Sequence, residues 1–199
     1  ILIWDRKENN MQKALSGTRK VLMFKLAKDR DKKNATRLAL ETTHTIKEAG
    51  KVATTETKDG TVNNPGEITT TIDIEALASD SPTYRLLHYA AKHSELVDCW
   101  EINFDKPSSD SKGKYLAQYG SGYLSSWETP DKVGDNETIK TTLNVDGKLV
   151  SGYATVSDED VATANNFFRD TTAAAKEEKG LDEYSQIYPE DTNKPASNN

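Results

Sequence analysis

Three histidines, His44, His88 and His93, are the side chains best suited to metal binding or acid–base chemistry. A zinc site on a helix needs ligands at spacings such as i, i+4, whereas His88 and His93 are five residues apart. His44 lies among threonines in a segment that reads as a strand, where a surface or half-buried position is expected. The histidine spacing therefore predicts no metal site.

The other reactive side chains do not form a catalytic pattern either. Gly120-Ser121-Gly122 is shorter than the Gly-x-Ser-x-Gly turn that exposes a hydrolase serine. Cys99 begins a predicted strand without a nearby histidine partner, so we expect a small buried thiol. Carboxylates are abundant, but nothing marks a close, unequal pair such as glycoside hydrolysis needs, and we interpret them as a solvated acidic face. We predict no enzyme activity and no cofactor.

Length and composition limit the class of protein. The chain has 199 residues, of which 26 are Lys or Arg, 32 are Asp or Glu and 35% are hydrophobic, and its formal charge is −6. This favours one domain with a thin core, because globular chains are about 45–50% apolar. The single cysteine excludes an internal disulfide and a cysteine-based zinc site and favours a reducing compartment. No apolar run approaches the roughly 18–20 residues that cross a bilayer and no cleavable leader is recognisable, so we expect neither membrane insertion nor classical secretion.

Charge is distributed unevenly along the chain. Residues 1–37 hold 11 basic and 4 acidic side chains, a balance of +7, and the remaining 162 residues hold 15 basic and 28 acidic ones, a balance of −13. The basic residues at 28–33 alternate with Asp29 and Asp31 and include no aromatic residue, which favours a solvated loop over a nucleic-acid site. From about Thr172 the chain is poor in apolar residues, so we predict a mobile C-terminal tail over 171–199.

Short runs rich in Val, Ile, Thr, Tyr and Trp between turn signals indicate strands along most of the chain. In the run 67–76, apolar residues and Thr70 alternate with acidic residues and threonines, which predicts one core face and one polar face. Asp59-Gly60 and Asp146-Gly147 are typical of tight hairpin turns, and residues 63–66 read as a break. Strands are expected at 20–26, 42–47, 51–57, 67–76, 98–105, 114–127, 137–145 and 148–156.

Two helices are expected among these strands. Ser81 can cap a helix and Pro82 suits its first position, so the apolar spacing that follows predicts a helix over 82–96. A second capping pattern at Ser157 predicts a short closing helix whose apolar stripe includes Phe168. The element order predicts a mainly β (α+β) fold, a β-sandwich or partly closed β-barrel with one flanking α-helix.

Threonine and β-branched residues occupy both faces of several predicted strands, as at 54–57 and 68–72. A thin core cannot bury both faces of such strands, and an exposed strand edge pairs readily with another chain. We therefore expect the strand edges either to be covered or to be used for self-association.

The run 41–76 is the most distinctive part of the sequence. Its threonine-rich stretch, then Thr57-Lys58-Asp59-Gly60, then Pro65-Gly66-Glu67 opening an alternating strand, resembles the major tail protein, or tail tube protein, of long-tailed siphophages that infect Gram-positive bacteria. Further segments agree in the same order: CWEIN from Cys99, YGSGYLSSW from Tyr119 and GYATV from Gly152. The resemblance spans about residues 21–168.

The resemblance implies a structural virion protein of the phage tail, assembled in the cytoplasm of the bacterial host. Copies of it would form rings, usually hexameric, which stack into the hollow tube through which DNA passes into the host. An N-terminal arm over 1–19 would precede a tail tube domain over 20–170. The implied partners are other copies of the chain, tape measure and tube terminator proteins, and double-stranded DNA in transit without specific binding; no membrane is involved.

Subunits of this family reach their neighbours through a long loop or hairpin between early strands, which here corresponds to 28–66. The resemblance makes six residues of that segment candidates for subunit contacts: Lys58, Asp59, Gly60, Asn63, Asn64 and Pro65.

The passage of DNA also limits the charge that the wall of such a tube can carry. A basic groove binds duplex DNA without specificity, with a dissociation constant of roughly 10⁻⁴ to 10⁻⁶ M, and repeated in every ring it would hold the genome back. A neutral or acidic wall avoids this. We hypothesise that the alternating strand turns Glu67, Asp73 and Glu75 toward the bore.

Two other functions stay open at the level of the sequence. A β-sandwich carbohydrate-binding adhesin could use Trp100, Trp127, Tyr119 or Tyr123 as a stacking platform, although such rings more commonly fill a core. A glycosidase would need a carboxylate pair that the sequence does not mark.

Overall fold

The computed structural model describes residue 17, residues 19–165 and the strand residues 168–169 and 177–178. The chain divides into two compact units, residues 1–154 and residues 155–199. The predicted N-terminal arm and C-terminal tail lie almost wholly outside the described residues. No helix among the described residues is long and apolar enough to cross a membrane.

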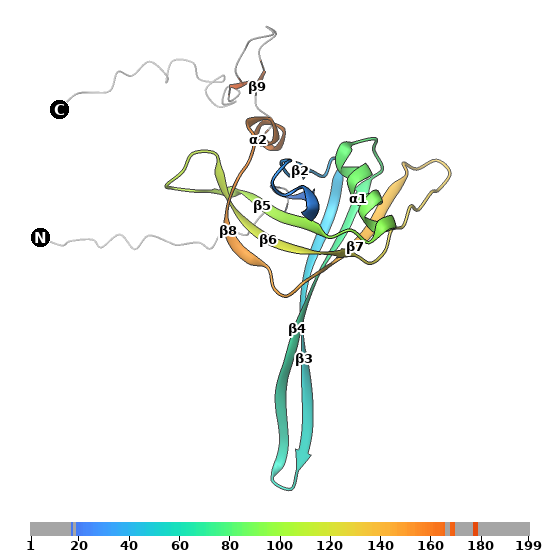
Figure 1. Ribbon diagram of the computed structural model, residues 1–199, viewed down its shortest axis with the longest axis vertical. Coiled ribbons are helices and arrows are strands. Elements are labelled where there is room, and N and C mark those ends of the chain that lie inside the picture. The colour runs from blue at the N-terminus through green and yellow to red at the C-terminus, as the bar shows by residue number, and fades with distance from the viewer. Residues whose placement is uncertain (1–16, 18, 166–167, 170–176, 179–199) are drawn as a thin grey trace, which may run out of the picture. The chain divides into compact units, whose positions relative to one another are not determined.

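An eight-stranded sheet dominates the first unit (Figure 1). Seven strands follow one another in the order β2-β1-β5-β6-β7-β4-β3, every neighbouring pair is antiparallel, and β8 pairs with β6. The predicted mainly β fold with a flanking helix is confirmed. The strands are β1 (Lys20–Leu26), β2 (Thr36–Arg37), β3 (Glu41–Thr57), β4 (Gly60–Leu77), β5 (Val97–Pro107), β6 (Lys114–Leu124), β7 (Thr138–Val145) and β8 (Val150–Thr155).

One face of the sheet packs with helix α1 (Pro82–His93) to form the main core. Strand β4 shows the alternation that its sequence predicts: Ile72, Ile74 and Ala76 are buried, while Asp73 and Glu75 between them are not. Alternation arises because successive side chains of a strand point to opposite faces. The core therefore determines which residues of β4 are left for other contacts.

Helix α1 begins where its capping residues predict. The Ser81 hydroxyl accepts a hydrogen bond from the backbone N–H of Tyr84 at 3.2 Å, and Pro82 is the first helical residue. The predicted end at 96 is wrong, because Ser94 adopts a left-handed conformation with φ of 50° and ends the helix after His93.

The hairpin of β3 and β4 is longer than predicted. Residues 42–57 form one strand rather than two, and residues 63–66 continue β4 rather than interrupt it. In place of the predicted break there is only a shift of register between Gly50 and Val52, opposite Gly66 and Glu67. The turn is formed by Lys58 and Asp59, since Thr57 pairs with Gly60, so the expected Asp-Gly turn is displaced by one residue.

Three further predictions, which concern β8, β6 and α2, are wrong. Strand β8 pairs with β6 instead of forming a hairpin with β7, because the chain after β7 stays beside β6, where Asp146 N–H donates to the Ser121 carbonyl at 2.7 Å. Strand β6 ends at Leu124 rather than at 127. In the second unit, α2 (Asp158–Asn165) ends before Phe168, which lies in β9 (Phe168–Arg169) and pairs with β10 (Glu177–Glu178).

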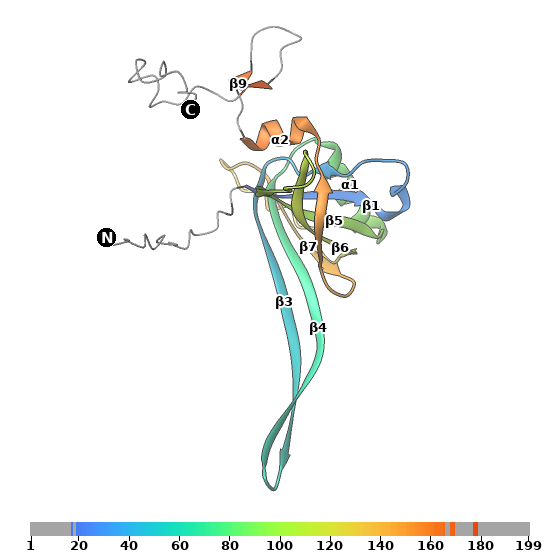
Figure 2. The ribbon, with the colours of Figure 1, turned by 90° about the vertical axis from the view of Figure 1, so that its left-hand side faces the viewer.

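Figures 1 and 2 show that the far half of the β3–β4 hairpin extends away from the sheet as a separate two-stranded ribbon. Strand β4 pairs with β7 only over Thr70–Leu77, so the hairpin has no other strand beside it beyond that point. The segment predicted to reach neighbours, 28–66, holds most of this hairpin together with β2 and the loop before it.

Candidate functional site

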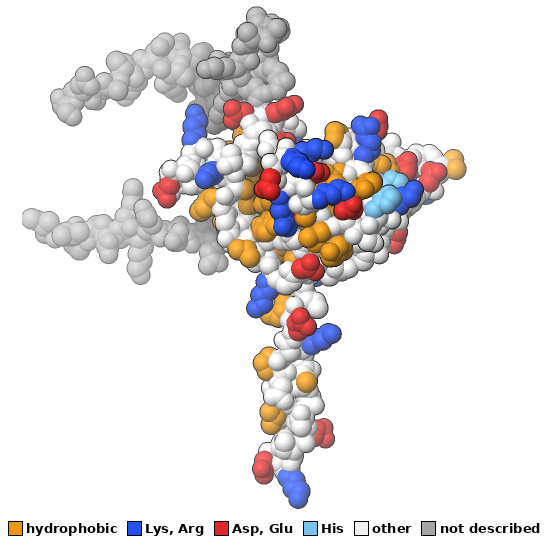
Figure 3. Space-filling model, viewed as in Figure 1, with side chains coloured by type: hydrophobic (Ala, Val, Ile, Leu, Met, Phe, Trp, Pro, Cys, Tyr) orange, Lys and Arg blue, Asp and Glu red, His pale blue; other side chains and the backbone are white. Residues whose placement is uncertain are grey.

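Residues 47–69, which we name the hairpin arm, are all exposed. They include the apolar side chains of Val52, Val62 and Ile68, which are 62%, 48% and 40% exposed. Figure 3 shows the arm as mostly uncharged, with a few apolar and charged side chains along it. An isolated two-stranded ribbon is only marginally stable in water. The arm therefore has the properties of a surface that packs against another molecule.

The structure places the six candidate contact residues at the distal end of the hairpin arm. Lys58 and Asp59 form the turn, and Gly60 follows it with a φ of 127°, a conformation that favours glycine. Asn63, Asn64 and Pro65 lie on β4, opposite Thr54, Ala53 and Val52. Asn63 and Pro65 share one face of the ribbon and Asn64 lies on the other, because the side chains alternate.

The three acidic candidates lie on the face of β4 that points away from the core. This face continues across the neighbouring strands, as the register of β3, β4 and β7 shows. We name it the threonine-rich face, and its members are Thr43, Thr45, Lys47, Thr69, Thr71, Asp73, Glu75, Lys140, Thr142 and Asn144. Lys47 and Thr69 lie at the base of the hairpin arm, and Glu67 lies farther out along it.

Ion pairs neutralise the carboxylates of the threonine-rich face. Lys47 donates to Asp73, Thr142 Oγ1 donates to the same carboxylate at 2.8 Å, and Lys140 Nζ lies 2.9 Å from Glu75 Oε1. The hydrogen bond from Lys47 holds the pKa of Asp73 below its ordinary value. Two lysines balance two carboxylates, so the face is polar but close to neutral, apart from Glu67.

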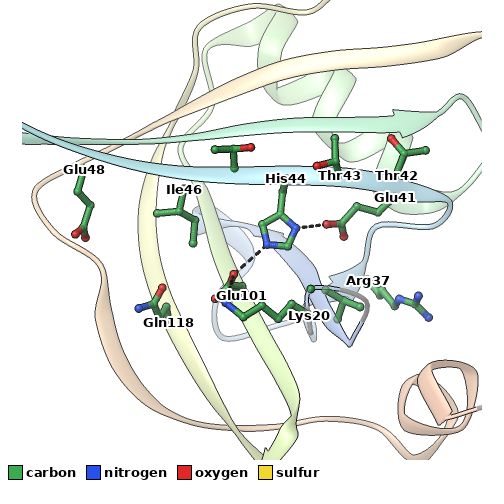
Figure 4. A pocket seen from close by; sticks show the side chains of 13 residues that line it. Lys20, Arg37, Glu41, Thr42, Thr43, His44, Ile46, Glu48, Glu101 and Gln118 are labelled. Carbon is green, nitrogen blue, oxygen red and sulfur yellow. Dashed lines mark hydrogen bonds and ion pairs between the residues drawn. The ribbon is translucent and has the colours of Figure 1, made fainter. Parts of the chain in front are cut away.

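A second polar cluster lies on the core side of β3, where it lines a hollow of about 850 Å³. The ring of His44 lies between two carboxylates, Glu41 at its Nδ1 and Glu101 on β5 at its Nε2, 3.0 Å away (Figure 4). Lys20 Nζ on β1 donates to both oxygens of Glu101 at 3.1 and 3.3 Å. The second oxygen of Glu41 accepts the backbone N–H of Leu22 at 3.0 Å.

His44 is more buried and more strongly paired than its sequence predicts, since only 11% of its side chain is exposed. Burial alone would lower the pKa of His44, but the hydrogen bonds to Glu101 and Glu41 outweigh burial and raise it to about 9. The position of His44 among threonines does not reveal this pairing, because Glu101 is distant in the sequence. The alternation of β3 is the one signal that places His44 on the core face with Ile46.

The other reactive side chains have structural surroundings. Cys99 is buried, as predicted, and burial raises the pKa of its thiol well above the ordinary value. Among the described residues, no group of three or more His, Cys, Asp or Glu side chains is placed to hold a metal ion. The Trp127 ring stacks on His88 of α1 with centroids 5.0 Å apart, whereas Trp100 packs on Tyr119, so the candidate rings do not form one platform.

Comparison with known sequences gives one family match. The profile of a family described as phage tail tube protein matches residues 14–151. No curated protein sequence matches the chain.

Several solved structures share the fold. The tail tube of SPP1, solved by solid-state NMR and cryo-EM, superposes with a TM-score of 0.64 at 17% identity, covering 84% of this chain and 98% of the SPP1 chain. The tail of an empty gene transfer agent particle, refined with C6 symmetry, gives 0.54 at 12% identity and covers 72% of this chain and all of the other. The virion of a native gene transfer agent particle gives 0.52 at 14% identity, covering 70% and 99%.

Proposed function

Since the chain belongs to the phage tail tube protein family, we propose that its copies join through their hairpin arms into closed rings, which stack into a tube for phage DNA. The protein is a structural component of the phage tail tube and has its place in the virion. The family is structural rather than enzymatic.

The observation that carries the proposal is the exposed hairpin arm. It has apolar side chains on a ribbon with no core of its own, and it extends from a sheet that is otherwise well packed. A neighbouring copy that covers Val52, Val62 and Ile68 would bury this surface. The contact residues proposed within the arm are Lys58, Asp59, Gly60, Asn63, Asn64 and Pro65.

Six copies per ring are proposed, because the similar gene transfer agent tail has C6 symmetry. The motifs at 41–76 support a long-tailed siphophage of a Gram-positive host as the source. Tape measure and tube terminator proteins would contact the tube at its inside and its end.

We propose that the threonine-rich face lines the bore, with Glu67, Asp73 and Glu75 among its residues. Its two lysines are paired with carboxylates, so it offers DNA no free cluster of positive charge. Threonine and asparagine side chains keep such a wall hydrated without net charge. DNA would then pass without being held.

Electron microscopy of the purified full chain over a range of concentrations tests assembly, together with mass measurement in solution. We expect rings or tubes that grow with concentration. A variant in which residues 51–67 are replaced by Asn-Gly should keep its folded sheet, because β4 still pairs with β7, but should stay monomeric.

A matched control shortens a different exposed loop, 131–136, and should still assemble. A full chain that stays monomeric at every concentration would contradict the proposal. Rings formed equally well without the arm would show that assembly uses another surface.

A further inference from the structure

Strand β3 is attached to the rest of the sheet in two different ways. One edge of β3 pairs with β4 through backbone hydrogen bonds, and no described strand pairs with its other edge. On that side, among the described residues, the hydrogen bonds from β3 to β5 and β1 come from its side chains: His44 to Glu101, and Glu41 to the N–H of Leu22. Figure 4 shows His44 pointing from β3 across to Glu101.

The geometry of His44 requires a proton on both ring nitrogens. Each nitrogen lies against a carboxylate oxygen, and a neutral imidazole can donate from only one of them. In the neutral form a nitrogen lone pair would face a carboxylate, whereas the imidazolium satisfies both contacts.

The charges around the ring are balanced. Glu41 and Glu101 carry two negative charges, and Lys20 and the imidazolium carry two positive ones. Glu48 on β3 and Arg37 on β2 line the same hollow, and Cys99 on β5 is a neutral thiol. Loss of the ring proton would leave this half-buried site with an excess of negative charge.

We propose that the imidazolium of His44 is a latch that fixes the base of β3 against β5 and thereby sets the direction of the hairpin arm before assembly. The latch is a property of the single subunit, and its consequence for assembly rests on the proposed function. From His44 to the turn at Thr57 the strand spans roughly 43 Å, so a rotation of about 10° at the base moves the tip by about 7 Å. Such a shift is enough to misplace a contact with a neighbour.

The latch depends on pH in a defined direction. The folded pKa of His44, about 9, is above the ordinary value of about 6.5, so its stabilising contribution is complete below about pH 6.5 and is lost as the pH rises through 9. Ring formation should weaken over the same upper range.

NMR of the wild-type protein tests the protonation state without any substitution. The ring nitrogens of His44 should titrate with a midpoint near pH 9. A midpoint at the ordinary value of about 6.5 would overturn the latch.

Hydrogen exchange of monomeric His44→Gln tests the mechanical role. Amides of 41–50 should exchange at least about tenfold faster than in wild type, while those of β5 and β6 stay protected. In His44→Gln, Glu41 and Glu101 carry two negative charges against the single positive charge of Lys20. The double variant His44→Gln/Glu101→Gln removes this excess charge, so it should be more stable than the single variant yet keep the mobile β3 base. His93→Gln, which alters an exposed histidine, is the matched control and should behave as wild type. Equal exchange in wild type and both His44 variants would overturn the latch.

Electron microscopy, combined with hydrogen exchange, distinguishes a failure of the latch from a failure of the proposed assembly. If wild type forms rings, and His44→Gln forms them poorly and exchanges faster at 41–50, the result supports both the latch and the proposed function. Faster exchange in a protein that never forms rings supports the latch and contradicts the proposed function. Unchanged exchange with normal rings contradicts the latch alone.

Discussion

Asp98 is a carboxylate with 1% of its side chain exposed, and its neighbours compensate its charge. Arg30 binds both oxygens at 2.6 and 2.7 Å, Tyr119 donates its hydroxyl at 2.9 Å and Ser121 also donates. Burial alone would raise the pKa of Asp98, but these hydrogen bonds outweigh burial and lower it. The network ties the loop after β1 to β5 and β6.

We predict that Asp98→Asn lowers the free energy of unfolding at pH 7 by about 1–3 kcal/mol, because Arg30 and the two hydroxyls lose a charged acceptor. Because the folded pKa is lowered, this contribution is present above about pH 4 and lost as the pH falls through the folded value. Urea unfolding from pH 7 down to pH 3 measures both effects. Asp110→Asn, in an exposed loop, is the control. Equal stability of Asp98→Asn and wild type at pH 7 would refute the account.

At the scale of elements, the junction of β6 and β7 depends on the absence of a side chain at Gly122. A Cβ there would lie 1.9 Å from the carbonyl oxygen of Asn144. Neither strand can move aside freely, because β6 also pairs with β5 and β7 also pairs with β4. Gly122 therefore permits the close approach of the two backbones.

We predict that Gly122→Ala lowers the free energy of unfolding by about 3 kcal/mol or more, because the added carbon meets backbone rather than a flexible side chain. Thermal and chemical unfolding measure the loss. Gly152→Ala is the matched control, since nothing lies within 4 Å of its Cβ position. A stable Gly122→Ala variant would mean that the strands separate more easily than the structure indicates.

Local sequence patterns predicted where strands and helices lie better than they predicted which strands pair with one another. Strand β1 and the start of α1 follow directly from alternation and capping, because both depend on neighbouring residues. The Asp146-Gly147 signal marks a bend of the chain, where Gly147 has a φ of 80°, but the predicted hairpin is wrong because β8 pairs with β6. Strand pairing depends on which strand edge is free in the folded sheet, and a local sequence pattern carries no information about that.

At the scale of the whole molecule, labelling of a new cysteine tests which face lines the bore. Asn144→Cys adds an exposed thiol to the threonine-rich face, and the native Cys99 is buried, so it does not interfere. In assembled tubes we expect a small maleimide to label it and a bulky polymer maleimide to be excluded. Dissociated subunits, which should accept both reagents, are the control.

Other labelling patterns would contradict the proposed bore. Labelling of the tube by both reagents would place the threonine-rich face on the outer wall. Labelling by neither would place it at a subunit interface.

The sequence by itself determined the class of the protein: alternation, turn residues and a threonine-rich run indicated a β fold whose strand edges are either covered or used for self-association, and no spacing indicated catalysis. It also placed Asp73 and Glu75 on the polar face of β4, because a period of two needs no knowledge of the fold. Only the tertiary structure decided that these carboxylates are paired with Lys47 and Lys140, and that His44 is held between Glu41 and Glu101. Such pairings join residues far apart along the chain, and the electrostatics of a buried group depends on distances that exist only after folding.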